Sequence, residues 1–295
     1  MWMRRQNYII TGRVIVCLFA LFMLSGCVQK IAMGSLGGII DNGFAVVNEE
    51  QDLGIAGASI ANNLVLLESL LRNDPDNEHY LLLTSLGYSS YALGFVEDDS
   101  IARARELYLR GREYGLRILR KNKAFAEAEN KPVSEFTAAL QTFSKDDAPA
   151  IFWTAAGWGS YLYASLTDPA ALADLPKIEA MMDFVAEHDS NYFYGGAHFF
   201  LGTLYGSRPK MLGGDSAISR NHFERCLAIN EGKFLMTYIY FARSYAVQTQ
   251  NQPLFESLLT RVDTTSLDIL PEARLSNAIA KRKALLLRSK INELF

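Results

Sequence analysis

Apolar and small residues recur along most of the chain at a spacing near 3.6 residues, the period of an α-helix. This pattern predicts helices over the ranges 55–71, 77–96, 101–121, 136–143, 150–166 and 271–294, with a segment starting at 168–169, a hairpin over 194–230 and another pair over 238–258. No stretch alternates strictly between apolar and polar residues between hairpin turns, so no strand is expected. The sequence therefore predicts an all-α protein.

The stretch from Tyr194 to Asn230 has the pattern of two helices joined by a Gly/Pro-rich turn. Its spacings resemble those of tetratricopeptide repeats, in which a small residue on one helix faces a ring on the next. Residues at the corresponding positions along the chain are Gly87, Ala104, Tyr108, Gly111, Trp153, Gly157, Leu201, Gly202, Tyr205, Phe223, Ala242 and Tyr245. Such hairpins bury their apolar faces against neighbours. The small residues 157, 202 and 242 lie 45 and then 40 positions apart, which is an irregular period. We therefore expect degenerate tetratricopeptide-like hairpins stacked into a compact α-solenoid.

The first 27 residues resemble the export signal of a bacterial lipoprotein. Arginines at positions 4, 5 and 13 are followed by the apolar run 14–24, and then by small residues before Cys27. The run is short for a membrane span. The resemblance implies cleavage after residue 26, lipidation of Cys27, a tether with a short first helix over 27–50, and a helical domain over 51–295. Val28 after the cysteine favours the outer membrane in such lipoproteins, while an uncleaved inner-membrane anchor remains the alternative.

Composition narrows the possible partners and chemistry. The 295 residues are 49% hydrophobic, and 29 basic against 32 acidic residues give a net charge of −3. This balance does not indicate a nucleic-acid-binding protein. Removal of the signal would leave Cys226 as the single unmodified thiol, on the apolar face of its helix, where a core position is expected.

Two blocks of sequence extend the resemblance to a specific family. They are the block 87–119, GYSSYALGFVEDDSIARARELYLRGREYGLRIL, and the 194–230 hairpin with its SRP and LGGD turns. Together with Cys27 they resemble the T component of tripartite ATP-independent periplasmic (TRAP) transporters. The resemblance implies a periplasmic lipoprotein that can assemble as a trimer and that binds the transporter's substrate-binding protein. It further implies assistance in the uptake of an organic-acid or hydrophobic ligand.

No catalytic or cofactor motif accompanies these features. The four histidines lack metal-ligand spacing, no nucleophile elbow or phosphate-binding loop is present, and His198 is expected to be a core or groove residue. We therefore expect no enzyme activity, no metal and no cofactor. The acidic pairs 98–99 and 146–147 are expected to cap helices, with Ser100 as a third N-cap candidate for the 101–121 helix. The arginine row of that helix is expected to be a solvated face rather than an anion site.

Aromatic residues exceed what one buried face per helix requires. We expect some to line a pocket, lumen or partner groove, and the candidates for this ligand or partner surface are Trp158, Tyr161, Tyr194, Phe200 and Tyr240. Two functions remain open at this stage. The first is docking of a periplasmic substrate-binding protein, and the alternative is a scaffold for outer-membrane or envelope assembly.

Overall fold

The computed structural model describes residues 38–165 and 172–295. It divides the chain into two compact units, Met1–Val47 and Asn48–Phe295. In the first unit, the described residues 38–47 are helical. Cys27 and the helix start predicted at 168–169 lie outside the described residues. Within the described residues the secondary structure is helical throughout and no strand is present, which confirms the all-α prediction.

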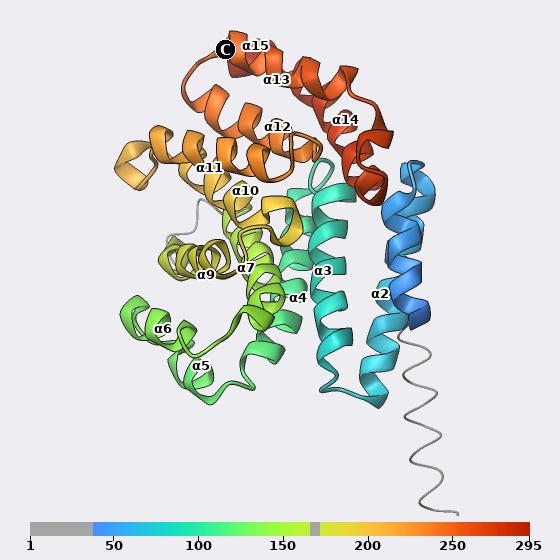
Figure 1. Cartoon of the computed structure of the whole chain (residues 1–295), viewed down its shortest axis with the longest axis vertical. Helices are drawn as coiled ribbons and strands as arrows, with labels where there is room; N and C mark the ends of the chain where they lie inside the picture. Colours follow the sequence, from blue (N-terminus) through green and yellow to red (C-terminus); the bar gives the residue numbers. More distant parts are fainter. Residues whose placement is uncertain (1–37, 166–171) are drawn as a thin grey trace, which may run out of the picture. The chain divides into compact units, whose positions relative to one another are not determined.

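The second unit is a succession of helices joined by short turns (Figure 1). Its α-helices are α2 (Leu53–Asn73), α3 (Glu78–Phe95), α4 (Ile101–Leu119), α5 (Lys123–Ala128), α6 (Val133–Leu140), α7 (Ala148–Tyr163), α9 (Leu175–His188), α10 (Tyr192–Gly206), α11 (Ser216–Ile229), α12 (Met236–Tyr240), α13 (Gln252–Thr264), α14 (Arg274–Ser289) and α15 (Ile291–Leu294). Single turns are η1 (Lys145–Asp147), η2 (Lys210–Leu212), η4 (Leu267–Ile269) and η5 (Pro271–Ala273), and η3 (Phe241–Ala246) is π-helical.

Two elements differ from the predicted ranges. The polar stretch 121–132, for which no separate helix was predicted, contains the short helix α5, whose N-cap Asn122 accepts a hydrogen bond from the Phe125 N–H at 3.2 Å. The last helix, expected as one piece over 271–294, is divided into η5, α14 and α15. Proline at position 271 occupies the first turn of η5, where its missing N–H is tolerated.

Helix starts follow the local capping chemistry. Asp52 accepts hydrogen bonds from the Gly54 N–H at 2.8 Å and the Ile55 N–H at 3.0 Å, which fixes the start of α2. Of the three N-cap candidates for α4, at positions 98, 99 and 100, Ser100 takes the role, with its hydroxyl 3.4 Å from the Arg103 N–H. Asp98 instead forms ion pairs across the fold.

Neighbouring helices approach closely where glycines face larger groups. A Cβ at Gly202 of α10 would lie 3.0 Å from the Phe223 ring of α11, and the Ser219 hydroxyl donates to the Gly202 carbonyl at 2.7 Å. A Cβ at Gly157 of α7 would lie 3.1 Å from the backbone of α4. The stack α3, α4, α7 and the pair α10, α11 therefore depend on residues without side chains at their crossing points.

The C-terminal helices return to the first helices of the unit. Helix α14 packs against α2, and the Asn277 amide binds the Lys233 carbonyl and accepts from the Leu235 N–H. A buried group of charges joins the end of α3 to α12, η3 and α14. We call it the Glu97 cluster, and its members are Glu97, Asp98, Tyr108, Tyr240, Arg243 and Lys283.

Lys283 lies at the centre of the Glu97 cluster with a side chain that is 3% exposed. Its ammonium is 2.8 Å from Glu97 Oε1 and 2.9 Å from Asp98 Oδ1. Burial alone would raise the pKa of Glu97, but the charges of Lys283 and Arg243 outweigh it and hold that pKa below its usual value. The carboxylate is therefore ionised and paired inside the protein.

The arginine row of α4 is mostly engaged within the fold rather than simply solvated. Arg110 pairs with Glu68 at 2.6 Å, Arg120 pairs with Glu129 at 2.7 Å, and Arg117 donates to the Pro75 carbonyl. These arginines fasten α4 to its neighbours. They leave little free charge for an external anion.

Candidate functional site

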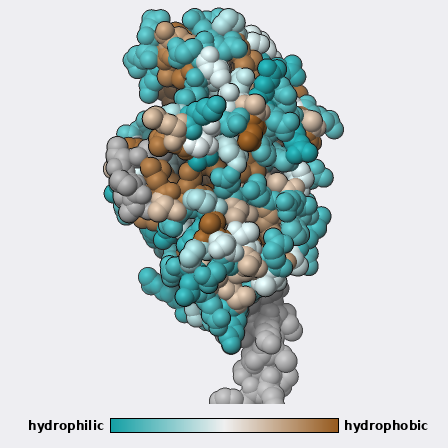
Figure 2. Space-filling model, turned by 90° about the vertical axis from the view of Figure 1, so that its left-hand side faces the viewer, coloured by the Kyte–Doolittle hydropathy of each residue, from teal (hydrophilic) through white to brown (hydrophobic). Residues whose placement is uncertain are grey.

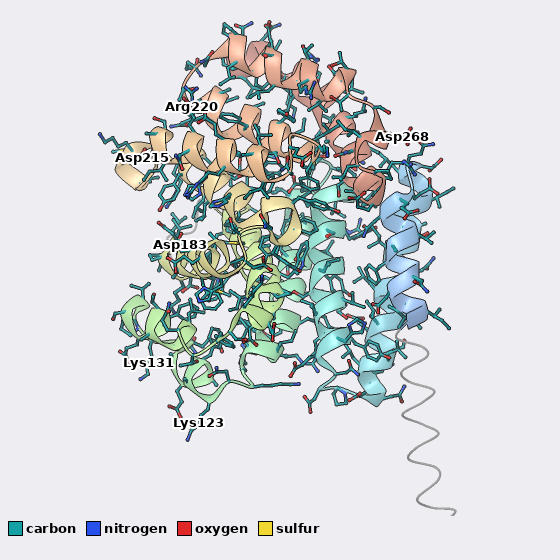
Figure 3. The ribbon with its side chains drawn as sticks, in the orientation of Figure 1. Lys123, Lys131, Asp183, Asp215, Arg220 and Asp268 are labelled. Carbon is teal, nitrogen blue, oxygen red and sulfur yellow. The ribbon has the colours of Figure 1, made fainter. Side chains whose placement is uncertain are left out.

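An open cleft of about 430 Å³ lies between α9, α10 and α11, and we call it the α9–α11 groove. Residues lining it are Asp183, Ala186, Glu187, Ser190, His198, His222, Arg225, Ala228 and Ile229. Figure 2 shows the side of the molecule that carries α9 and α11, where apolar residues gather in the middle of the face and hydrophilic residues surround them. Figure 3 shows Asp183 on this side, together with Asp215 and Arg220 at the start of α11.

Two histidines form the floor of the groove. His198 of α10 and His222 of α11 face each other with their Nδ1 atoms 2.9 Å apart, and the second nitrogen of His198 lies 3.1 Å from the Ser190 hydroxyl. A single proton fits between the two Nδ1 atoms, so at least one ring is neutral. Burial, followed by the effects of His198 and Arg225, lowers the pKa of His222 to about 4. Burial likewise lowers the pKa of His198, which is 4% exposed, in agreement with its expected core position.

One wall of the groove is acidic. Glu179, Asp183 and Glu187 follow one another at intervals of four along α9, so their side chains share one face and repel one another. Burial, with Glu179 and Glu187 as further causes, raises the pKa of Asp183 to about 6. In the described part of the chain neither Asp183 nor Glu187 forms an ion pair, whereas Glu179 accepts a hydrogen bond from the Tyr205 hydroxyl. The wall thus carries negative charge without a cation of its own.

The opposite wall, formed by α11, carries Arg225, which is exposed and has no carboxylate partner among the described residues. Ala228 and Ile229 continue this wall with apolar surface. The groove therefore has an acidic side, a basic side and a neutral imidazole floor. Walls of opposite charge can orient a bound segment by its own charges.

Beside the groove, α10 begins with a left-handed turn. Phe193, Tyr194 and Gly195 have φ values of 47°, 60° and 80°. A non-glycine residue in this region costs roughly 1–2 kcal/mol, so other contacts must stabilise the turn. The Asn230 amide donates to the Tyr194 carbonyl at 3.1 Å, and the Tyr194 ring stacks on Phe234 with centroids 4.9 Å apart.

The five residues predicted to form a ligand or partner surface differ in their exposure. Trp158 and Tyr240 are 5% and 8% exposed, so they contribute almost no outer surface. Trp158 lies under the Arg112 guanidinium, and the Tyr240 hydroxyl donates to Glu97. The other three, Tyr161, Tyr194 and Phe200, are partly exposed and remain candidates.

The groove was not predicted from the sequence because its two histidines are distant in the chain. His198 and His222 are 24 residues apart and show no ligand spacing. The acidic face of α9 was visible as a repeat of four, but its charges carried no motif. Cys226 is buried, as expected, with its sulfur 3.4 Å from the Thr237 hydroxyl. Within the ranges that the structure describes, no three His, Cys, Asp or Glu residues are arranged to hold a metal ion.

The sequence of the second unit matches a known protein family. The profile of the family described as "TRAP transporter T-component" matches residues 49–295. The chain belongs to this family. Its members are transporter components, which associates the chain with a TRAP transporter and with the periplasm or membrane in which such a transporter works. An uncharacterized protein of Treponema pallidum (strain Nichols) is 23% identical over 273 residues, covering 85% of this chain and 82% of that protein.

The groove makes a pH-dependent contribution to stability that can be measured. His222 stays neutral in the folded protein down to about pH 4. Its contribution to the free energy of unfolding is therefore fully present above the unfolded pKa of about 6.5, and is lost as the pH falls from there towards the folded value. This loss amounts to about 2 kcal/mol by about pH 5. We expect His222→Asn, which retains a group near the Nδ1 position, to lose less stability between about pH 7.5 and pH 5 than the unmodified protein. Urea unfolding at the two pH values measures the difference.

Asp183 provides a control of opposite sign. Its folded pKa lies above the unfolded one, so it stabilises the fold as the pH falls through about 6. Asp183 is partly desolvated by its neighbours, but more than a third of the residue remains exposed, and solvent screening keeps this effect small. Asp183→Asn should therefore make the acid-induced loss slightly steeper. An identical pH dependence in His222→Asn and the unmodified protein would contradict the buried histidine pair.

Proposed function

We propose that the protein is a non-enzymatic periplasmic lipoprotein that docks the substrate-binding protein of a TRAP transporter. In this role it assists the uptake of an organic-acid or hydrophobic ligand. The observation that carries the proposal is the family match over residues 49–295, which covers the second unit except for its first residue. The proposed division of the chain is a signal peptide over 1–26, a lipidated tether over 27–50 with its anchor at Cys27, and a helical domain over 51–295.

The α9–α11 groove is the contact surface that we assign to this docking. Asp183 and Glu187 present charge without a bound cation, and Arg225 stands on the facing wall. A partner segment with a basic side chain would satisfy the carboxylates and keep one orientation in the groove. Apolar contacts from Ala228 and Ile229 would add burial at the centre of the interface. Of the aromatic candidates, Tyr161, Tyr194 and Phe200 are retained as further contacts.

A crosslinked pull-down of the full lipidated protein from cell envelopes tests the function. We expect a periplasmic substrate-binding protein as the main partner. Barrel-assembly proteins in its place would favour the alternative, a scaffold for envelope assembly. The same crosslinked material, analysed for its mass, tests whether copies of the chain assemble as a trimer.

Charge reversal in the groove tests the surface. Asp183→Arg places a cation where the partner's cation is expected, so recovery of the substrate-binding protein should fall about tenfold. Glu106→Arg on α4 is the matched control, because the Glu106 side chain is 66% exposed and lies on another helix. We expect the control to retain full recovery. Equal recovery with both variants would remove the groove from the interface without touching the family assignment.

A further inference from the structure

The outer face of α2 is apolar and exposed. Ile55, Val65 and Leu66 are 58%, 65% and 45% exposed. The other exposed positions from the start of the helix to Ser69 are small or uncharged, namely Gly54, Ala58, Asn62 and Ser69. Their intervals of three and four residues place them on one side of the helix, and we call this surface the α2 outer face. Its one charged neighbour is Arg72, exposed in the last turn of the helix.

The inner face of α2 belongs to the fold. Ile60, Leu64 and Leu67 are buried, and α2 packs against α3. Glu68, one of two charged residues in the helix, receives hydrogen bonds from the Tyr88 and Tyr114 hydroxyls at 2.7 and 2.8 Å. By length and composition α2 is the described helix that is apolar enough to cross a membrane, yet its contacts hold it in the helical stack. It is therefore apolar on both sides while packed on only one.

Helices α4 and α11 do not share this property. The exposed side of α4 carries Arg103, Arg105 and Glu106, and that of α11 carries Arg220 and Glu224. A helix whose second face meets water usually has charged or polar residues there. The composition of α2 instead fits a helix whose second face meets an apolar medium.

We propose that the α2 outer face lies on the membrane, at the boundary between the lipid headgroups and the acyl chains. This inference rests on the proposed lipid anchor at Cys27. Twenty-five residues, 28–52, separate that cysteine from Leu53. Fully extended they would reach at most about 90 Å, and the helical residues 38–47 shorten this reach. The anchor therefore keeps α2 close to the bilayer at a high effective concentration, so a face that binds lipid weakly on its own remains in contact.

A fluorescent probe on the α2 outer face tests the contact. The full lipidated protein carrying Val65→Cys, labelled with an environment-sensitive fluorophore, is reconstituted into vesicles of phosphatidylethanolamine and phosphatidylglycerol with brominated acyl chains. Cys226 is buried and does not compete for the label. We expect bromine to quench the probe at position 65 at least about twofold more than a probe introduced by Leu285→Cys. Leu285 is the matched control because it is a leucine on α14 with 66% exposure.

Flotation of the same vesicles separates the possible outcomes. Protein that floats with the vesicles and shows no extra quenching at position 65 would overturn the membrane contact while leaving the anchor intact. Protein that does not float would show that the anchor itself is absent, and the inference would fail with it. The probe at position 65 could instead be shielded from solvent in a way that bromine does not affect and that increases with protein concentration. That result would overturn the membrane contact and assign the α2 outer face to a second copy of the chain. A Val65→Glu and Leu66→Glu variant probed through Asn62→Cys should lose the extra quenching.

Discussion

Lys283→Met lowers the free energy of unfolding by about 3–5 kcal/mol, because it leaves Glu97 and Asp98 without the buried cation that they share. The Lys283 ammonium lies 2.8 Å from Glu97 and 2.9 Å from Asp98. Methionine preserves most of the side-chain volume, so the loss reports the charge rather than a cavity. Urea unfolding followed by circular dichroism near neutral pH measures it.

Arg288→Met is the control for this prediction. Arg288 also lies on α14 and pairs with Asp263, but the two side chains are 35% and 34% exposed. Exposed pairs contribute less than about 1 kcal/mol. A second test is the combined Glu97→Gln and Lys283→Met variant, which should recover part of the loss because one unpaired charge is removed. Equal losses for Lys283→Met and Arg288→Met would contradict the Glu97 cluster.

The acid dependence of the cluster gives an independent check. Because the folded pKa of Glu97 is held low, its stabilisation is present above the unfolded pKa and is lost as the pH falls through the folded value. Lys283→Met removes much of the charge that holds this pKa low. The free energy of unfolding of the Lys283→Met variant should therefore fall less steeply in acid than that of the unmodified protein.

Phe223→Ala is expected to lower the free energy of unfolding by about 3–5 kcal/mol, since it empties a fully buried site between three elements. Phe223 is 0% exposed, and its ring stacks on Phe241 with centroids 4.8 Å apart. Ile218→Ala is the control on the same helix, because Ile218 is 41% exposed. That substitution should change stability by less than about 0.5 kcal/mol.

The contact between Phe223 and Gly202 adds a sharper test. A Cβ at Gly202 would lie 3.0 Å from the ring, so Gly202→Ala alone should destabilise the protein. In the Phe223→Ala background the same methyl group enters space that the ring has left. The two substitutions should therefore cost less together than the sum of their separate costs, and simple additivity would contradict this packing.

The helices were predictable because their signals are local. Apolar spacing predicted α2, α3 and α4 to within a few residues, and nearby polar residues mark their starts, as Asp52 does for α2. A Gly/Pro-rich turn likewise predicted the hairpin of α10 and α11. Local patterns could not show that Asp98 would turn away from α4 to bind Lys283, since that contact depends on how α14 returns to the first helices.

The site was harder to predict for a related reason. Its floor requires His198 and His222 to meet across a helix pair, and its walls come from α9 and α11. Abundant aromatic residues indicated a surface, but packing placed Trp158 and Tyr240 in the interior. Aromatic side chains in stacked helices first fill the interfaces between those helices. The number of aromatic residues therefore overestimates the aromatic surface that stays exposed.

The separation of the partners in the Glu97 cluster has a consequence for how the chain reaches its folded state. Glu97 and Lys283 are 186 positions apart, so their contact forms only when nearly all of the chain is present. During synthesis or passage through a membrane channel, which release the N-terminal part first, the first helices still lack their partner in α14. Contacts of such long range slow the completion of a fold. The first helices therefore lack these stabilising contacts until the end of the chain is available to supply them.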